Sequence, residues 1–541
     1  MDLFPVPEDH SILASRGTPA HKISIRPLVI LCGILAGAAV LGLRWSAPPP
    51  PAGGITVIFG EEPRTLDPAL ASTLLEGKLL PAFLEGLTVP DAETLEPRPG
   101  MAERWDISAD GKRYEFHLRE ALWSDGRPVT AEDFRWSWMR VLSTPEAPMW
   151  ELLAPVRGAR SFREKKTPED AVGLSAPDPR TFVVELDQPT PWFLGLTSTM
   201  TFLPVPRPAV ETHGRRWTRP GHFVANGPFT LARWEPNFRI VAARNPRYWD
   251  TAHVALEGVT FLSVPPGPTQ FNLYAGGAAS WIADPQPDLV RDLAGRPDLH
   301  VSPRLGISFV RLAANHPPFA DNRVRRAFSL AIDRRRLTAV NAAGQIPFAA
   351  FVPPGFSGYP EPDLPLSDPA AARSLLDAAG FPGGVRFPEV RFLYPSQKEF
   401  RVVAETLQAI WQDELGVTVR MDRVDRKEWA RRMREVDYDL CLSSWIGDYR
   451  DPNSFLEIFL SGSGNNRTGW SDAEYDGLVR RAAGESGEVR LATLAAAERR
   501  LLEEGPAAPL YVPVTIELWD PRLKGIRENA LGVHPLKGVG R

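Results

Sequence analysis

The sequence predicts an α/β protein of two or more domains, on three observations. The chain has 541 residues, more than one hydrophobic core usually organises. Short apolar runs typical of strands recur along it without an internal repeat. From about Gly306 to residue 504 these runs alternate with helical patterns, which predicts βαβ units and a mainly parallel sheet.

The first half of the chain carries strand patterns and one clear helix start. ITVIFG (55–60) is an apolar run, and RYEFHLR (113–119) alternates as a half-buried strand does. Thr130 and Asp133 follow the spacing of a capping box, which predicts a helix after residue 130. Near the end of the chain, the strand-like run APLYVPVTIELW (508–519) follows the helix 488–504 and is expected to return to the first domain.

One stretch combines a strand, an aromatic residue and a carboxylate. YDLCLSSWIGDYRDPNSF begins with an apolar run over 438–445, and Asp451 with Pro452 has the pattern of an N-cap and a first helical residue. Asp448 is therefore expected in the loop beyond the carboxyl end of a strand, where open α/β sheets bind ligands.

Composition and motifs exclude several classes of function. The net charge is -4 with acids and bases interspersed, so a basic surface for nucleic acid is not expected. The sequence contains no GxSxG, P-loop, GxGxxG, HExxH or CxxC motif, and its nine His are scattered. We therefore expect no enzyme, no catalytic residue, no cofactor and no metal site.

The N-terminus indicates export. Residues 27–43 carry no charge and are long enough for a short membrane helix, with basic residues on their N-terminal side. The following segment lacks a small-x-small cleavage pattern, which favours a retained signal anchor over a removed secretory signal. The Pro-rich residues 44–53 would then form a stalk, with residues 1–26 in the cytoplasm and the rest on the periplasmic or cell-surface side.

Several motifs, taken in order, resemble one family. They resemble the oligopeptide-binding proteins of ABC importers, the family 5 extracellular solute-binding proteins. The similarity runs from about Gly54 to the C-terminus. The motifs are EPRTLDPAL (62–70), FLEGLTV (83–89), ALWSDGRPVTAEDFRWSWMR (121–140), NGPFTLARWEPNFRIVAARNPRYWD (226–250), PPFADNRVRRAFSLAIDRRRL (317–337) and SWIGDYRDPNSF.

The resemblance implies a two-lobed periplasmic-binding-protein fold of class II type with a third, small inserted domain. On that pattern the first lobe comprises 54–84, 207–305 and 505–541, the inserted domain 85–206, and the second lobe 306–504. The protein is expected to be a monomer that closes on its ligand by hinge rotation.

The resemblance also implies a set of ligand-binding residues. Asp448 would receive the α-ammonium group of a peptide, because a cation that loses its water needs a charge-assisted partner. Trp445 lies beside it, and Trp429 matches a cleft tryptophan. Backbone groups of the remaining residues would pair with an extended peptide as an added strand. These are Ser444 to Gly447, including Ile446, together with Thr73 and Leu74.

The sequence departs from the better-known peptide binders at several positions. Met149 replaces a tyrosine, Ile446 stands where some members have a cysteine, and Phe400 and Leu442 occupy positions that hold basic residues in some members. How the carboxyl end of a ligand is held is therefore open, with Arg401 and Arg450 as candidate substitutes.

The function that the resemblance implies is capture of a small peptide and its delivery to an ABC permease in the membrane. Alternatives within the same fold are an oligosaccharide, a cell-wall peptide or a nickel chelate, and the scattered His weaken the last. A membrane-anchored sensor and a secreted hydrolase are the alternatives from other classes, and no motif supports the hydrolase.

Overall fold

A computed structural model describes residues 53–286, 289–341 and 343–541. The predicted segments 1–26, 27–43 and, apart from Gly53, 44–53 lie outside the described residues. No helix within the described part of the chain is long and apolar enough to cross a membrane.

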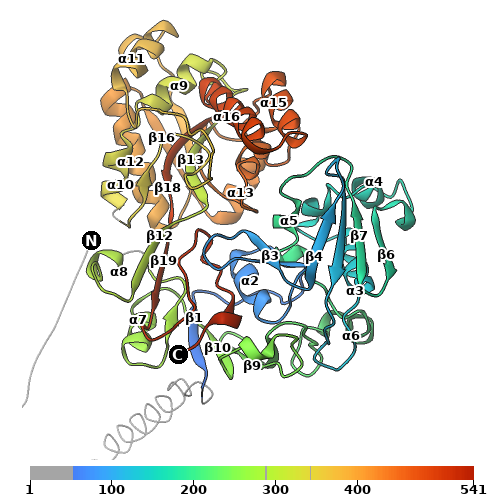
Figure 1. Cartoon of the computed structure of the whole chain (residues 1–541). Helices are drawn as coiled ribbons and strands as arrows, with labels where there is room; N and C mark the ends of the chain where they lie inside the picture. The colour runs from blue at the N-terminus through green and yellow to red at the C-terminus, as the bar shows by residue number, and fades with distance from the viewer. Residues whose placement is uncertain (1–52, 287–288, 342) are drawn as a thin grey trace, which may run out of the picture. The chain divides into compact units, whose positions relative to one another are not determined.

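The first large sheet has seven strands in the order β12-β19-β11-β1-β10-β9-β8 (Figure 1). Only the pairs of β1 with β10 and β11 are parallel. The strands are β1 (Ile55–Phe59), β8 (Phe229–Glu235), β9 (Arg239–Arg244), β10 (Gly258–Ser263), β11 (Trp281–Ile282), β12 (Leu299–Pro303) and β19 (Val514–Trp519). The helices α2 (Leu74–Leu79), α6 (Arg207–His213), α7 (Pro268–Ala275) and α8 (Leu289–Asp292) belong to the same segments of the chain.

A four-stranded antiparallel sheet and a short hairpin lie between β1 and β8 in the sequence. The sheet order is β4-β5-β7-β6, and the hairpin is β2 (Thr88–Pro90) with β3 (Pro97–Pro99). The sheet comprises β4 (Ala102–Ile107), β5 (Arg113–Leu118), β6 (Leu174–Asp178) and β7 (Thr181–Glu185), with helices α3 (Ala131–Ser143), α4 (Ala159–Arg163) and α5 (Phe193–Leu196). The predicted capping box of Thr130 and Asp133 opens α3. This sheet shares one continuous apolar core with the seven-stranded sheet.

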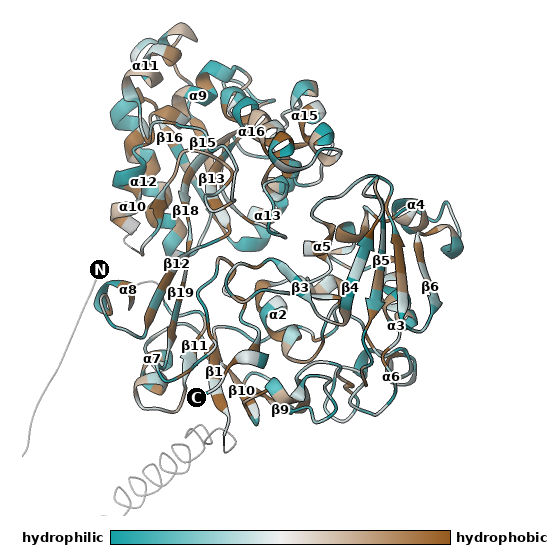
Figure 2. Ribbon diagram, viewed as in Figure 1, coloured by the Kyte–Doolittle hydropathy of each residue, from teal (hydrophilic) through white to brown (hydrophobic). Residues whose placement is uncertain are grey.

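The third sheet has six strands in the order β14-β18-β13-β17-β15-β16. They are β13 (Gly306–Leu312), β14 (Ile346–Pro347), β15 (Val390–Pro395), β16 (Val419–Val424), β17 (Leu440–Ile446) and β18 (Ala507–Val512). The helices of this part are α9 (Asn322–Leu330), α10 (Arg334–Asn341), α11 (Pro369–Ala378), α12 (Lys398–Leu415), α13 (Arg426–Glu435), α14 (Asn453–Leu456), α15 (Ala473–Ala483) and α16 (Gly487–Glu504). Separate apolar clusters pack against the sheet, and Figure 2 shows apolar residues gathered in its strands and in the helices beside it.

Two expectations about this part are wrong. The sheet is not mainly parallel, because only the pairs of β15 with β16 and β17 are parallel. The segment 505–541 does not lie wholly in the first lobe, since β18 pairs with β13 and the chain enters the first sheet only after Pro513. Both differences follow from strand direction. β13 runs away from the place where the chain passes from the first sheet to this one, whereas β17 and β18 run back towards that place.

The two crossings of the chain between the large sheets touch each other. The backbone N–H of Arg304, between β12 and β13, donates to the carbonyl of Pro513, between β18 and β19, at 2.8 Å. The two-lobed α/β fold with an inserted third sheet thus has a double connection between its two large sheets.

Candidate functional site

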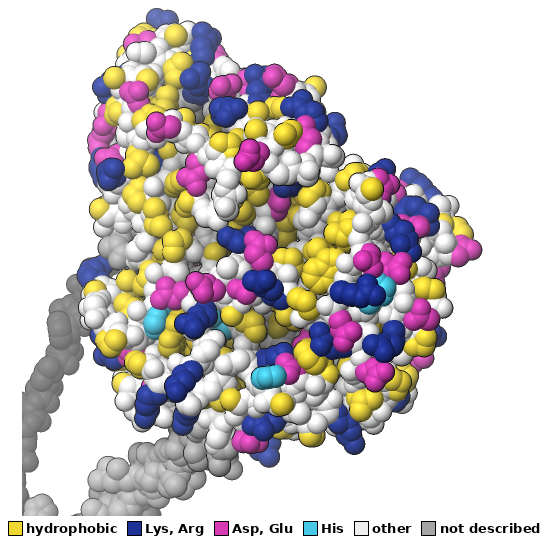
Figure 3. Space-filling model, viewed as in Figure 1, with side chains coloured by type: hydrophobic (Ala, Val, Ile, Leu, Met, Phe, Trp, Pro, Cys, Tyr) yellow, Lys and Arg dark blue, Asp and Glu magenta, His cyan; other side chains and the backbone are white. Residues whose placement is uncertain are grey.

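A cavity of about 780 Å³ lies where all three sheets contribute loops. Its walls are largely apolar, and in Figure 3 hydrophobic side chains gather in the region of α5 and β3, while acids and bases alternate over the visible surface. Lining residues come from the start of α2 (Thr73, Leu74), the β2–β3 hairpin (Leu95, Glu96), the inserted sheet's loops (Met149, Trp192, Leu194, Met200) and the loop after β17 (Ile446 to Pro452).

The loop after β17 carries Asp448 into this cavity. Gly447 precedes it at a close approach, where an added Cβ would lie 3.1 Å from the ring of Phe455 and 3.2 Å from Leu305. The backbone N–H of Asp448 donates to the hydroxyl of Ser454 at 2.9 Å, which fixes the loop to the start of α14. The helix begins at Asn453, one residue later than predicted, and the Asp451 carboxylate accepts the Asn453 N–H at 2.8 Å.

The carboxylate of Asp448 is half-buried and makes no hydrogen bond or ion pair with any residue that the structure describes. Burial raises its pKa from 3.8 to about 6, because the charged form loses water without gaining a partner. Glu457 lies in the same neighbourhood, and burial together with the charge of Asp448 raises its pKa to about 7. Asp448 thus lacks a cationic partner among the residues that the structure describes.

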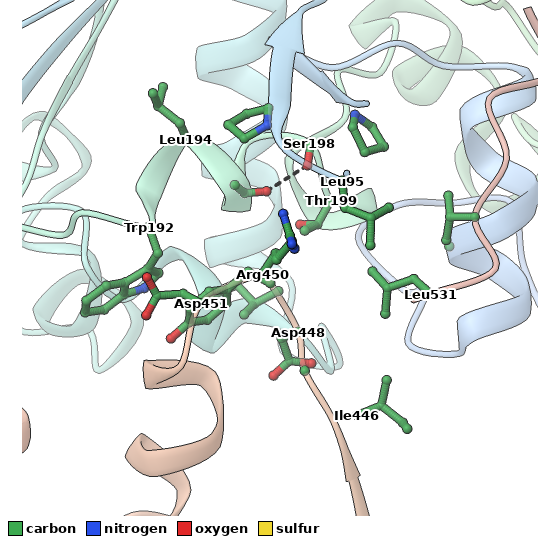
Figure 4. Close-up of a pocket in the computed structure, with 18 of the residues that line it drawn as sticks. Leu95, Trp192, Leu194, Ser198, Thr199, Ile446, Asp448, Arg450, Asp451 and Leu531 are labelled. Carbon is green, nitrogen blue, oxygen red and sulfur yellow. Dashed lines mark hydrogen bonds between the residues drawn. The ribbon is translucent and has the colours of Figure 1, made fainter. Parts of the chain in front are cut away.

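The three residues after Asp448 are each fixed by contacts. Tyr449 stacks on Trp192, which lies beneath the guanidinium of Arg490. Arg450 pairs with Glu96 of the β2–β3 hairpin at 2.8 Å and donates to the carbonyl of Gly355 at 2.9 Å. Asp451 accepts two bonds from Arg490, at 2.7 and 2.8 Å. Figure 4 shows Asp448, Arg450 and Asp451 on this loop with Trp192 beside it.

Five of the eight predicted site residues line the cavity: Thr73, Leu74, Ile446, Gly447 and Asp448. Thr73 also caps α2, since its side chain accepts the Glu76 N–H while Glu76 accepts the Thr73 N–H.

The other three lie outside the residues that line this cavity. Trp445 is partly buried and packs against the core of the second lobe, and its indole donates to the carbonyl of Ser454 at 2.8 Å. Trp429 donates to the carbonyl of Leu442 at 3.2 Å, and Ser444 is exposed opposite Ser308. Their roles towards a ligand stay predictions.

The edge of β17 offers backbone groups to an extended ligand. The strand pairs with β13 over its whole length but with β15 only at Leu440 and Cys441. Within the described part of the chain, residues 442–446 therefore have a partner strand on one side only. Such an edge is the usual site for addition of a peptide strand.

Sequence reasoning missed the contribution of the inserted sheet's loops and of the β2–β3 hairpin. Trp192, Leu194, Met200 and Glu96 line the cavity, yet no local pattern distinguishes them from other residues of their kind. Of the two candidate cations, Arg450 lines the cavity, whereas Arg401 lies 3.9 Å from Glu405 on the surface of α12. Leu442 packs in the core of the second lobe, and the partly buried Phe400 packs against that core.

Contacts among four of the quoted motifs build the frame around the cavity rather than its walls. Asp67 accepts two bonds from Arg140, at 2.8 and 2.5 Å, and one from the indole of Trp217 at 3.0 Å. Glu85 accepts bonds from Tyr248 and, at 2.7 Å, from Trp249. Within the described residues, no group of three or more His, Cys, Asp or Glu side chains could hold a metal ion.

Comparison with known proteins gives consistent results. The family described as bacterial extracellular solute-binding proteins, family 5 Middle, matches residues 96–467. The periplasmic murein peptide-binding protein MppA of Escherichia coli (strain K12) is 34% identical over 87% of this chain and 89% of its own length. The probable deoxycholate-binding periplasmic protein YgiS of the same organism is 33% identical over 86% of this chain and 89% of its own length.

Among solved structures, a periplasmic oligopeptide-binding protein (OppAIV) from Borrelia burgdorferi superposes with a TM-score of 0.78 at 31% identity. The match covers 90% of this chain and 99% of the other. The family model, the sequence similarity and the fold therefore agree, and the chain belongs to the bacterial extracellular solute-binding proteins of family 5.

Proposed function

We propose that the protein is the binding component of an ABC importer, that it captures short peptides in this cavity outside the cytoplasm, and that it delivers them to a membrane permease. In this proposal Asp448 receives the α-ammonium group of the peptide, and the protein acts as a monomer without catalysing a reaction. The similarity to proteins named for murein peptide and oligopeptide binding supports the class of ligand.

The observation that carries the proposal is the unpaired carboxylate of Asp448. A carboxylate that is half-buried, without a partner and titrating near pH 6 is costly to the empty protein. An ammonium group enclosed beside this carboxylate would form charge-assisted hydrogen bonds with it. These bonds would compensate both groups for the hydration free energy that they lose. The bonding edge of β17 and the start of α2 would hold the peptide backbone, independently of side-chain sequence.

The apolar walls favour ligands with aliphatic or aromatic side chains. They would also suit an apolar anion, the class to which the name of YgiS points for that relative. The unpaired acid argues against an anion here, because a second carboxylate near Asp448 would be repelled. The unpaired Asp448 carboxylate likewise gives a neutral oligosaccharide no advantage in binding affinity.

The proposal is tested with the full chain and four ligand sets. The sets are a mixture of tripeptides built from alanine, leucine, phenylalanine and lysine, the same mixture N-acetylated, a mixture of short glucans, and deoxycholate. Native mass spectrometry should show one peptide per chain from the free tripeptides and little from the other three sets. Preferential retention of deoxycholate or glucans, or appearance of cleaved peptides after incubation, would replace peptide capture with another function.

A further inference from the structure

The turn of the β2–β3 hairpin, residues 91–96, contains a residue with an unusual backbone conformation. Leu95 has a φ of 61°, in the left-handed region where residues other than glycine are uncommon. Its neighbours Thr94 and Glu96 are exposed, whereas Leu95 is only 7% exposed and lines the cavity. This turn therefore places an apolar side chain in the cavity wall at a cost in backbone strain.

Contacts within the turn impose this conformation. The Asp91 N–H donates to the carbonyl of Glu96 at 2.8 Å, and the Leu95 N–H donates to the carbonyl of Asp91 at 3.1 Å. The Asp91 carboxylate accepts the N–H of Glu93 at 3.1 Å and that of Thr94 at 2.9 Å. Glycine or asparagine would adopt the same backbone with less strain. The turn itself does not need a leucine, so the reason for this side chain lies in the cavity that it faces.

Two further apolar side chains line the cavity on the same side of Asp448 as Leu95. Ile446 ends β17, and Leu531 belongs to the C-terminal segment after β19. Both are partly buried. In Figure 4 the three side chains lie on the side of Asp448 that is away from Trp192. An apolar surface built from three distant segments of the chain therefore lies beside the carboxylate.

A buried asparagine fixes two of these segments to each other. The side-chain amide of Asn529 donates to the carbonyl of Ala92 in the hairpin turn at 2.9 Å. Its oxygen accepts the N–H of Leu531 at 3.1 Å and that of Val533 at 3.2 Å. The hairpin and the C-terminal segment are thus held together in the empty protein, which lowers the cost of ordering this wall when a ligand binds.

We propose that Leu95, Ile446 and Leu531 form a pocket for the side chain of the first ligand residue, and that the protein selects peptides whose first residue is large and apolar. The inference rests on the proposed function, because this first-residue pocket requires the ligand's ammonium group at Asp448. A peptide that runs from Asp448 along β17 leaves the cavity after Ile446, since none of the described residues 442–445 lines it. The cavity therefore surrounds the first part of the ligand.

The charged residues of the cavity give a charged first side chain no partner. Among the described lining residues, the charged side chains other than Asp448 are Glu96, Arg450 and Asp451. Arg450 is paired with Glu96 at 2.8 Å, and Asp451 is paired with Arg490 at 2.7 Å. Asp448 itself is engaged by the ammonium group. A charged side chain in the first-residue pocket would lose water without gaining a partner, whereas an apolar side chain gains affinity through burial.

A simpler role for Leu95 is to pack the hairpin turn against the rest of the protein. The two roles differ in what they discriminate. A packing role affects all peptides alike, whereas a pocket for the first side chain discriminates between peptides that differ only in that residue. The discriminating quantity is therefore the affinity ratio of Leu-Ala-Ala to Ala-Ala-Ala.

The test titrates the full chain by calorimetry with Ala-Ala-Ala, Leu-Ala-Ala, Phe-Ala-Ala and Glu-Ala-Ala. Each methylene that is buried is worth roughly fourfold in affinity. Leu-Ala-Ala should therefore bind to wild type at least about tenfold more tightly than Ala-Ala-Ala. Glu-Ala-Ala should bind more weakly than Ala-Ala-Ala, because its side-chain carboxylate finds no cation.

Two variants suit the backbone of the turn and change the pocket. Leu95→Asn keeps a side chain of similar size but makes it polar, and it should lower the ratio to about threefold or less. Leu95→Gly enlarges the pocket, so the affinity for Phe-Ala-Ala should rise several-fold relative to that for Leu-Ala-Ala. In both variants the affinity for Ala-Ala-Ala should stay within about twofold of wild type, because its first side chain buries little surface.

The control is Val436→Asn. Val436 caps the C-terminus of α13, has a φ of 54° and is partly buried, but it does not line the cavity. The substitution relieves the same kind of strain and should keep the wild-type ratio. A wild-type ratio near unity would overturn the inference, as would a tenfold preference that survives in Leu95→Asn. An equal loss of all four peptides in both Leu95 variants would show a packing role alone.

Failure of the underlying function looks different. If wild type binds none of the four peptides, peptide capture itself fails and the inference falls with it. If wild type binds all four with equal affinity and Asp448→Asn binds none, peptide capture stands and only the first-residue pocket is refuted.

Discussion

Trp192 of the inserted sheet stacks on Tyr449, the residue that follows Asp448, with ring centroids 5.7 Å apart and ring planes 6° apart. The guanidinium of Arg490 lies 5.3 Å from the centroid of the Trp192 ring. The neighbour of the residue proposed to anchor the ligand therefore contacts a part of the protein that lies far earlier in the chain. This contact ties the loop that carries Asp448 to the wall of the cavity that the inserted domain forms.

Replacement of Trp192 should accelerate ligand release. Trp192→Ala removes an aromatic stack and a cation–π contact, each worth about 0.5 to 1.5 kcal/mol. We expect the dissociation rate of a bound tripeptide to rise about tenfold and the association rate to change much less. Stopped-flow fluorescence measures both rates.

The control for this experiment is Trp136→Ala. Trp136 is also half-buried in the inserted domain and lies 5.8 Å from the guanidinium of Arg207, but it does not line the cavity. Equal release rates in the two variants would show that the Trp192 contact has no part in holding the ligand.

Asp448→Asn should stabilise the empty protein. The folded-state pKa of about 6 lies above the ordinary 3.8, so the carboxyl favours folding in its neutral form and that stability is lost as pH rises through 6. At pH 7.5 the variant should gain about 1 to 2 kcal/mol, a value reduced because the group is only half-buried. The gain should shrink as the pH is lowered from 7.5 to 4.5.

Urea denaturation at the two pH values measures the effect. A variant that is more stable and yet binds less is the signature of a residue kept for function. A loss of stability at pH 7.5 would mean that the Asp448 carboxylate has a partner in the folded protein.

Peptide affinity should depend on pH through the same group. Between pH 7 and 6.5 the dissociation constant should change little, and below about pH 6 it should rise towards tenfold per unit as Asp448 is protonated. The peptide ammonium stays charged over this range. Calorimetry from pH 5 to 7 should show a flat profile for Asp448→Asn.

Glu457 is the other titrating group close to Asp448, with a pKa of about 7. Glu457→Gln measured in parallel should therefore keep the rise below pH 6. If the rise persists in Asp448→Asn and vanishes in Glu457→Gln, the titrating group is Glu457 and our assignment to Asp448 is wrong.

Much of the site could be predicted locally, and the rest depends on contacts distant in sequence. The apolar run that forms β17 and the Gly and Asp-Pro signals after it are local, and they predict Asp448 in the loop beyond the strand, where it lines the cavity, whereas Thr73 is implied only by the family resemblance. The partners of the next residues are not local, since Glu96 lies 354 positions from Arg450. Nothing in the sequence around Trp192 indicates that this residue contacts Tyr449.

Strand direction was the other part that local patterns could not supply. The apolar runs of β13 and β18 are evident in the sequence, but periodicity does not tell whether neighbouring strands are parallel. Direction here follows from the double crossing at Arg304 and Pro513, a tertiary feature. Two of the quoted motifs meet in the pair of Asp67 with Arg140, which lie 73 positions apart, a separation that no local pattern bridges.

The predicted anchor can be tested separately from the ligand. If residues 27–43 are retained, the protein should stay with the membrane fraction after carbonate extraction, because an uncleaved apolar helix does not leave the bilayer. Deletion of residues 1–52 should release it. A mature N-terminus near residue 47 would refute the anchor while leaving the binding function untouched.

The central claim is that Asp448 pairs with a peptide ammonium group, and a four-way calorimetric comparison tests it most directly. Wild type and Asp448→Asn are each titrated with the tightest-binding tripeptide of the mixture and with its N-acetylated form. Loss of an enclosed charge partner costs about 2 to 5 kcal/mol, which is roughly 30-fold to several thousand-fold in affinity. Either change alone should produce such a loss, and the second should add less than about threefold, since both break one contact. Losses that multiply independently, or a variant that binds like wild type, would contradict the account.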